Sequence, residues 1–171
     1  NTDNIIKLLR NVKKLNISIL EPDVNTSETE FISKKYNEIE YGLAAIKNVG
    51  HKSTKQLVEY RKKNGHFKTI FDLCKIGPQA MNKKVLESLI KSGACDCLHG
   101  TRAQLYDLID PALKFSQRYY DDHNSNQSNL FANLDDQTYS YPDLPDIEDW
   151  SQTITLKNEK EVLGFYLSGN P

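Results

Sequence analysis

The sequence has little of the material that marks a secreted or membrane protein. It contains only three cysteines among 171 residues, an odd number that fits free thiols in a reducing compartment better than a disulfide framework. No apolar run approaches the roughly 20 residues that a membrane span needs. The first residues, NTDNIIKLLRNVKK, lack the apolar stretch and the small-residue cleavage site of a secretory signal. These absences predict a soluble, cytoplasmic protein.

Clusters that would hold a metal or perform catalysis are also poorly represented. Cys95, Cys97 and His99 form a C-x-C-x-H string, but structural zinc needs four ligands, usually with its cysteines two to four residues apart. The carboxylates of residues 143–149 superficially resemble a two-metal site, yet they fall in a proline-interrupted stretch, whereas such sites need rigid elements. We therefore expect no metal, no cofactor and no catalytic residue in this chain.

The net charge is only −1, but two long stretches of the chain each have few charges of one sign. Residues 44–95 hold eleven Lys or Arg against three acids, a net of +8, whereas residues 121–171 hold two Lys against ten acids, a net of −8. A stretch with so strong a positive balance suits a polyanion. The distribution predicts a basic nucleic-acid surface beside an acidic tail.

The apolar periodicity predicts a mainly α chain with four parts. Residues 1–43 read as an amphipathic helix, ending near Asn16, followed by a small β-hairpin or three-stranded sheet with a turn at residues 34–37. Residues 44–120 read as two consecutive helix-turn-helix units, with a capping box at Thr101 and Gln104 and a last helix fading near Tyr120. Residues 121–150 read as a flexible acidic linker, and residues 151–171 as a helix that packs back on the core.

The turn of the first unit is the most informative local feature. A helix-hairpin-helix needs small or left-handed-tolerant residues on both sides of one buried apolar residue, and Asn48, Val49 and Gly50 satisfy this requirement. Such a turn delivers the next helix with unpaired amides that suit a phosphate group. The candidate DNA-binding residues are Lys47, Asn48, Val49, Gly50, His51, Lys52, Ser53 and Lys55.

Further along, Arg61, Lys62, Lys63 and Lys68 are predicted to extend this positive charge. Phosphate contacts give affinity without reading base sequence, so the predicted binding is non-specific. The second turn, over residues 76–82, lacks the paired small residues, and we expect it to serve mainly in packing. An alternative remains that the lysines only solvate exposed helix faces, as in helical modules that bind proteins.

Several segments resemble the alpha subunit family of bacterial DNA polymerase III, the replicative C-family polymerases. They are ILEPDVN (19–25), YGLAAIKNVG (41–50), FDLC (71–74), NKKVLESLIKSGA (82–94), TRAQL (101–105) and LGFYLSGNP (163–171). The resemblance covers almost the whole chain. It implies the tandem helix-hairpin-helix and clamp-binding domain, which in that family follows the fingers and precedes an OB-fold. Asn48 departs from the glycine usual there, but Asn tolerates the left-handed region best among the other residues.

A short peptide inside the acidic linker carries a second prediction. Leu130 and Phe131 are two large apolar side chains in a stretch without helical or strand periodicity, and burying each in a partner is worth ~1.5–3 kcal/mol. The pentapeptide Gln127–Phe131 is similar to the family's internal clamp-binding motif, Gln-x-x-Leu-Phe. The resemblance implies that Gln127 forms hydrogen bonds and that Leu130 and Phe131 fill the cleft of the sliding clamp. The alternative is that both side chains fold back on their own domain.

Together these features predict a non-catalytic region of a replicative polymerase. The resemblance implies double-stranded DNA, the sliding clamp (the beta subunit) and other polymerase III holoenzyme subunits as partners. It also implies that the catalytic aspartates of the parent nucleotidyltransferase lie in a palm domain that precedes this region. Two alternatives stay open: a helix-hairpin-helix module that binds only protein, and a fragment of a DNA-repair glycosylase or lyase. The latter needs a catalytic Lys or Asp after the hairpin, which the sequence does not offer.

Overall fold

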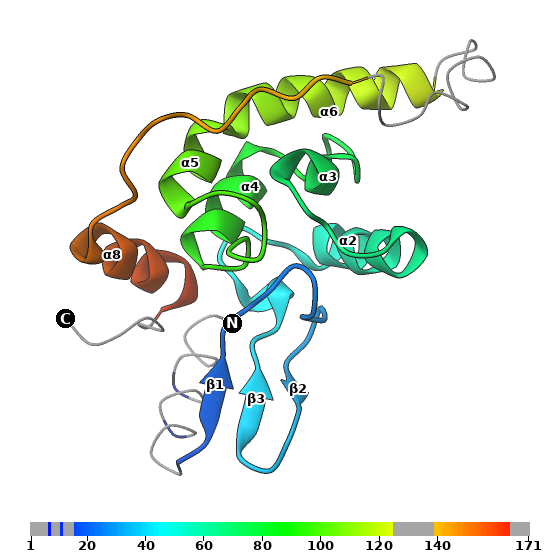
Figure 1. The fold of residues 1–171 in the computed structure, drawn as a ribbon. Coiled ribbons are helices and arrows are strands. Elements are labelled where there is room, and N and C mark those ends of the chain that lie inside the picture. The colour runs from blue at the N-terminus through cyan, green and yellow to red at the C-terminus, as the bar shows by residue number, and fades with distance from the viewer. Residues whose placement is uncertain (1–6, 8–10, 12–15, 125–138, 165–171) are drawn as a thin grey trace.

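A computed structural model describes residues 7, 11, 16–124 and 139–164 of the chain, and these residues form a mainly α fold with one small sheet (Figure 1). The predicted fold class is thereby confirmed. The predicted helix before Asn16 falls almost entirely outside the described residues. The strands are β1 (Ser18–Leu20), β2 (Ile32–Ser33) and β3 (Glu38–Glu40), followed by the 3-10 turn η1 (Leu43–Ala45) and the helices α2 (His51–Asn64), α3 (Ile70–Cys74), α4 (Lys83–Lys91), α5 (Arg102–Asp107), α6 (Ile109–Asn124) and α8 (Gln152–Leu163).

The small sheet has three strands, so the second of the two sheet predictions is correct. Its order is β1-β3-β2, with β1 parallel and β2 antiparallel to β3. The turn between β2 and β3 closes where Asn37 adopts a φ of 72°, a left-handed conformation that Asn tolerates. Its Lys34 N–H donates to the Glu38 carbonyl at 3.0 Å. The turn predicted at residues 34–37 is therefore present.

The hydrophobic core lies between the helices, with α4 packed against α5, α6 and α8. Leu86, Leu89 and Ile90 of α4 are fully buried, and truncating one such leucine to alanine costs ~2–5 kcal/mol. The α4 helix ends at Ser92, and Gly93 follows with a φ of 89°, as a glycine after a helix C-terminus commonly does. Figure 1 shows α2 on one side of this helical core and α8 on the other.

The first helix of the predicted hairpin is shorter than expected. Instead of a helix beginning at Leu43, the structure has only the η1 turn, and Ile46 after it is extended. The amides of Leu43 and Ala44 donate to the carbonyls of Glu28 and Thr29, at 3.0 and 3.1 Å. Because these neighbouring residues satisfy the backbone, the segment does not need further helical turns.

The linker prediction for residues 121–150 is wrong at both of its ends. At the first end, α6 continues to Asn124 rather than fading near Tyr120. Where the described chain resumes, the Tyr139 hydroxyl donates to Asp122 of α6 at 2.8 Å. Burial of Tyr139, followed by this hydrogen bond, raises the pKa of its hydroxyl to about 12, so the group stays a neutral donor. Residue 139 therefore returns the chain to the end of α6.

Residues 139–150, which we call the strap, then run along the core in extended form. The Tyr141 ring stacks on Phe71 with centroids 4.6 Å apart, and the Asp149 carboxylate accepts the Ala103 amide at 3.2 Å. Trp150 packs edge-to-face on Tyr106 at 5.6 Å, as an anchor at the end of the strap would. The acids and prolines predicted mobility, but the aromatic side chains bury themselves on the core and hold the strap in place.

In residues 16–124 and 139–164, no helix is both long enough and apolar enough to cross a bilayer.

Candidate nucleic-acid interface

The turn between η1 and α2 has the backbone geometry that the sequence predicts. Asn48 has a φ of 67°, in the left-handed region. The next residue, Val49, is 3% exposed, and its amide donates to the Ile46 carbonyl at 3.0 Å. Val49 therefore anchors the turn in the core and does not offer its amide to a ligand. The chain reverses in three residues and enters α2 at His51.

The N-terminus of α2 differs from those of α3, α4, α5 and α8. Its cap residue, Gly50, offers no side chain, and Gly50 O accepts only the Thr54 amide and hydroxyl, each at 3.1 Å. The amides of His51, Lys52 and Ser53 donate to no other described residue. By contrast, a side-chain oxygen caps the first turn of α3, α4, α5 and α8, from Thr69, Asn82, Thr101 and Ser151 respectively.

Space outside this helix start is open. A Cβ placed on Gly50 would meet no atom within 4 Å, so the protein itself does not require a glycine there on steric grounds. The backbone of Gly50 is extended, with φ −84° and ψ 167°, which any residue adopts. A glycine in open space at an uncapped helix N-terminus permits the close approach of an anion.

Positive side chains surround the uncapped amides. Lys47, Lys52 and Lys55 are exposed, and none of them forms an ion pair with a described residue. His51 is also exposed, and its Nδ1 lies 3.2 Å from Glu30 Oε1. Ser53 is half-buried at the start of the helix. The structure thus brings seven of the eight predicted residues to the surface around one turn, with Val49 beneath them.

The α8 helix supports the hairpin from beneath, a contact that no local sequence pattern predicts. The Lys47 amide donates to the Val162 carbonyl at 2.9 Å, and the Tyr41 hydroxyl donates to the Leu163 carbonyl at 3.4 Å. The Lys47 backbone is therefore occupied by α8, while its ammonium is free to face solvent. No local pattern signals this contact, because residues 47 and 162 are brought together only by the tertiary fold.

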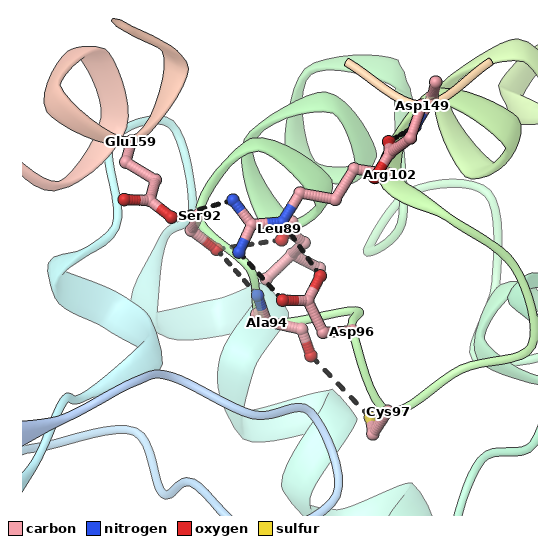
Figure 2. A network of polar contacts seen from close by, with 9 residues as sticks. Leu89, Ser92, Ala94, Asp96, Cys97, Arg102, Asp149 and Glu159 are labelled. Carbon is pink, nitrogen blue, oxygen red and sulfur yellow. Dashed lines mark hydrogen bonds and ion pairs between the residues drawn. The ribbon is translucent and has the colours of Figure 1, made fainter. Parts of the chain in front are cut away.

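An ion network around the buried Arg102 and Glu159 fixes α8 in this position (Figure 2). Arg102 of α5 donates to both Asp96 oxygens, at 2.9 and 2.8 Å, and to Glu159 of α8 at 2.8 Å. Glu159 is fully buried. Burial alone would lower the pKa of Arg102, but the hydrogen bonds to Asp96 and Glu159 raise it above its ordinary value. The guanidinium stays charged and joins α8 to the core.

The second hairpin, at residues 76–82, is built differently. Gly77 has a φ of 134°, and Met81 and Ala80 are buried. The side chain of Asn82 accepts the Val85 amide at 3.0 Å and so occupies the first turn of α4. An anion at this helix start would have to displace that cap. This geometry agrees with the expectation that the second turn serves in packing.

Arg61 is the one predicted surface cation that the structure places inside the protein. It is 8% exposed and donates to the carbonyls of Val24 and Ser27 at 2.9 and 2.8 Å. The helical spacing of α2 could have revealed this, because Arg61 follows the buried residues Leu57 and Val58 at intervals of four and three. Arg61 is therefore a structural residue, whereas Lys62, Lys63 and Lys68 remain exposed.

The predicted clamp-binding residues Gln127, Leu130 and Phe131 lie outside the described residues. The structure does describe both flanks of this segment. Tyr139 packs on Phe115 and Tyr119 of α6, with centroid distances of 5.3 and 5.6 Å. The described chain thus leaves off at the end of α6 and, at Tyr139, lies against the same helix again.

Cysteines 74 and 95 are buried free thiols, and burial raises the pKa of each. Cys97 Sγ accepts the Asn25 side-chain amide at 3.3 Å and donates to the Ala94 carbonyl at 3.8 Å. These contacts give the two thiols of the C-x-C-x-H string structural surroundings. Within the described residues, no group of three potential metal ligands comes together.

Comparison with known proteins identifies the relatives of this chain. The model of the family described as "Helix-hairpin-helix motif" matches residues 16–105. Over its full length the chain is 36% identical to DNA polymerase III subunit alpha of Buchnera aphidicola and of Pasteurella multocida, and 33% identical to that of Escherichia coli. It spans about 15% of the length of each of these relatives. The chain belongs to the helix-hairpin-helix family and is related along its whole length to a segment of DNA polymerase III subunit alpha.

Proposed function

We propose that this chain is the part of a replicative DNA polymerase that binds duplex DNA without reading its sequence. One observation carries the proposal: α2 alone among α2, α3, α4, α5 and α8 has no side-chain cap, and exposed lysines surround its free amides. A DNA phosphate satisfies those amides and is attracted by both the helix dipole and the lysines. The relationship to DNA polymerase III subunit alpha supports DNA as the anion.

Sequence independence follows from the chemistry of these groups. Backbone amides and lysine ammonium groups recognise phosphate oxygens, which are the same at every base pair. Gly50, Lys52 and Lys55 lie together at the start of one helix. The bound DNA would therefore be held by its backbone alone.

A salt titration with random-sequence duplex DNA tests this proposal. Each phosphate contact changes the slope of log affinity against log salt by about −0.9, so Lys52→Glu with Lys55→Glu should weaken binding to every sequence equally and flatten the slope by about 2. Lys157→Glu on α8, an exposed lysine on another helix, is the matched control. Unchanged affinity of the double variant would exclude the hairpin site and favour the alternative of a module that binds only protein.

We further propose that Gln127, Leu130 and Phe131 dock on the sliding clamp. Two observations support this: the likeness of the pentapeptide to the family motif, and the return of Tyr139 to Asp122 at 2.8 Å, which anchors the segment at both flanks. Five residues give modest affinity, but a clamp on the same DNA raises the effective concentration. Such a tether would give the polymerase its processivity.

Replacing Gln127, Leu130 and Phe131 together by alanine tests the clamp proposal. Binding to the purified clamp should be lost in a pull-down, while the midpoint of urea unfolding stays the same, since the core that the structure describes is formed by other residues. The matched control replaces Ser128 and Asn129, which lie within the same pentapeptide, by alanine. Clamp binding that survives the triple substitution would rule out this peptide as the docking site.

The proposal also covers the polymerase activity of the longer protein to which such a region would belong. The relatives are named as a polymerase subunit, and we propose that nucleotidyl transfer takes place in other domains of such a protein. This region would act without a cofactor, in the cytoplasm, beside other holoenzyme subunits. A glycosylase or lyase is disfavoured, because the relatives of this chain are named as a DNA polymerase subunit.

A further inference from the structure

A polar cavity lies at the opposite end of α2 from the hairpin. Its volume is about 330 Å³, and its walls come from the last turn of α2, the loop after it, α3 and the end of α6. Figure 1 shows α3 between α2 and α6 on this side of the molecule. The volume falls at the lower end of the range for small-ligand sites. We call this cavity the α2–α3 pocket.

The charges that line the α2–α3 pocket suit an anion. Lys68 is exposed at its mouth, whereas the Lys75 side chain is only 6% exposed and lies 5.7 Å from the centre of the Tyr119 ring. His66 and Asn64 add two polar side chains. With two lysines and one aspartate among the lining residues, these three side chains give the pocket a net charge of +1.

Asp72, the one carboxylate among the residues that line the pocket, accepts hydrogen bonds from backbone amides. Asp72 Oδ2 accepts the amides of Lys68 and Thr69, at 3.0 and 3.2 Å, as part of the capping box of α3. Its Oδ1 lies 3.7 Å from Lys75 Nζ, longer than the ~2.7–2.9 Å of a charge-assisted hydrogen bond. Lys75 thus keeps an ion pair with Asp72 while it lines the pocket.

A stripe of charge connects the pocket with the hairpin. Lys52, Lys55 and Lys62 are exposed on α2 at spacings that place them along one side of the helix, interrupted by the exposed Glu59. With 14 residues in α2, the two ends lie about 20 Å apart at 1.5 Å per residue. That length corresponds to about six base-pair steps of duplex DNA at 3.4 Å each, so one bound duplex would extend across both ends.

We propose that the α2–α3 pocket is a second phosphate site, which holds a backbone phosphate of the DNA whose other phosphate is bound at Gly50–Ser53. The inference rests on the proposed DNA binding. Lys68 and Lys75 provide the ammonium donors, and Asn64 and His66 line the pocket beside them. A phosphate here fixes the direction of the DNA along α2, which one contact at the hairpin cannot do.

Lys68→Ala is the decisive variant, because its exposed side chain makes no contact that the fold needs. Loss of one phosphate contact should weaken duplex binding about fivefold at about 0.15 M salt and flatten the salt slope by about 1. The matched control is Lys157→Ala on α8, which should leave both quantities unchanged. A second variant, Lys75→Met, should weaken binding similarly, and its urea midpoint shows whether it is folded.

Comparison with a hairpin variant separates the two proposals. If Gly50→Asp weakens DNA binding and Lys68→Ala does not, the second site is wrong and the hairpin site stands. If neither variant changes DNA binding, both proposals fail. Titration of the chain with millimolar inorganic pyrophosphate, followed through the amide signals of residues 64–68, tests a free phosphate as the occupant. Pyrophosphate binding that Lys68→Ala removes, with duplex affinity unchanged, would overturn the assignment to DNA.

Discussion

Gly50→Asp places a carboxylate where we propose that DNA places a phosphate. The extended backbone of Gly50, with φ −84° and ψ 167°, is the conformation of a capping residue, and a Cβ there meets nothing within 4 Å. The new side chain can therefore accept the amides of Lys52 or Ser53 without strain. The substitution should stabilise the fold while it blocks the proposed ligand.

The size of both effects follows from these contacts. Replacing a glycine cap by aspartate gains a few tenths of a kcal/mol, and a negative charge at a helix N-terminus adds ~0.3–1 kcal/mol, so unfolding should require about 0.5–1 kcal/mol more. For DNA, loss of one amide hydrogen bond to a charged phosphate costs ~1.5–3 kcal/mol. Affinity for duplex DNA should therefore fall by at least about tenfold, beyond any added charge repulsion.

Two measurements check this prediction, and a matched variant controls it. Urea unfolding measures stability, and fluorescence anisotropy with a random duplex measures affinity. Ser151→Asp adds the same charge at the start of α8, whose cap already accepts the Ile154 amide at 3.3 Å, and it should leave DNA affinity unchanged. Gly50→Asp protein that is more stable and yet binds DNA as tightly as the wild type would refute the phosphate role of these amides.

Two further predictions concern the residues that hold the fold around the hairpin. Arg61→Met leaves two buried carbonyls without their donor and should lower the free energy of unfolding by ~2–4 kcal/mol in a urea titration. The control Lys62→Met, at the exposed neighbouring position, should change this free energy by no more than ~0.5 kcal/mol. Equal unfolding midpoints for the two variants would contradict the buried role of Arg61. Partial burial, followed by the negative charge of Asp96, raises the pKa of Glu21 above its ordinary value of 4.5. The ionised form of Glu21 therefore lowers the free energy of unfolding at neutral pH. This loss disappears as the pH falls below 4.5, where the carboxyl is protonated in both the folded and the unfolded state. Glu21→Gln should therefore be more stable than the wild type at neutral pH and equally stable at about pH 4, and a difference that persists in acid would reject this cause.

Local signals predicted the hairpin well. Asn48 takes the left-handed conformation that its side chain tolerates, Val49 is buried, and α2 begins directly after Gly50. The capping box at Thr101 and Gln104 is present for the same reason. Each of these features depends on residues no more than a few positions apart, and the side chains themselves impose the geometry. The clamp-binding role of residues 127–131 stays a prediction.

Other features depended on contacts between distant parts of the chain. The strap was predicted to be mobile from its acids and prolines, but Tyr141 stacks on Phe71, 70 positions earlier in the sequence. A pairing of this kind has no counterpart in local periodicity, because it depends on which surfaces the helices leave open after they have packed. Composition therefore gave the wrong expectation for residues 139–150.

By itself, the sequence determined where the chain reverses, where most helices begin, and that one half carries the positive charge. The tertiary structure decided which of those charges face solvent: it buried Arg61 beneath the loop at Val24 and Ser27, and it left Lys52 on the surface. It also placed Val162 of α8 under the hairpin. The physical reason is that a turn needs only its own residues, whereas burial and support need partners that folding brings from far along the chain.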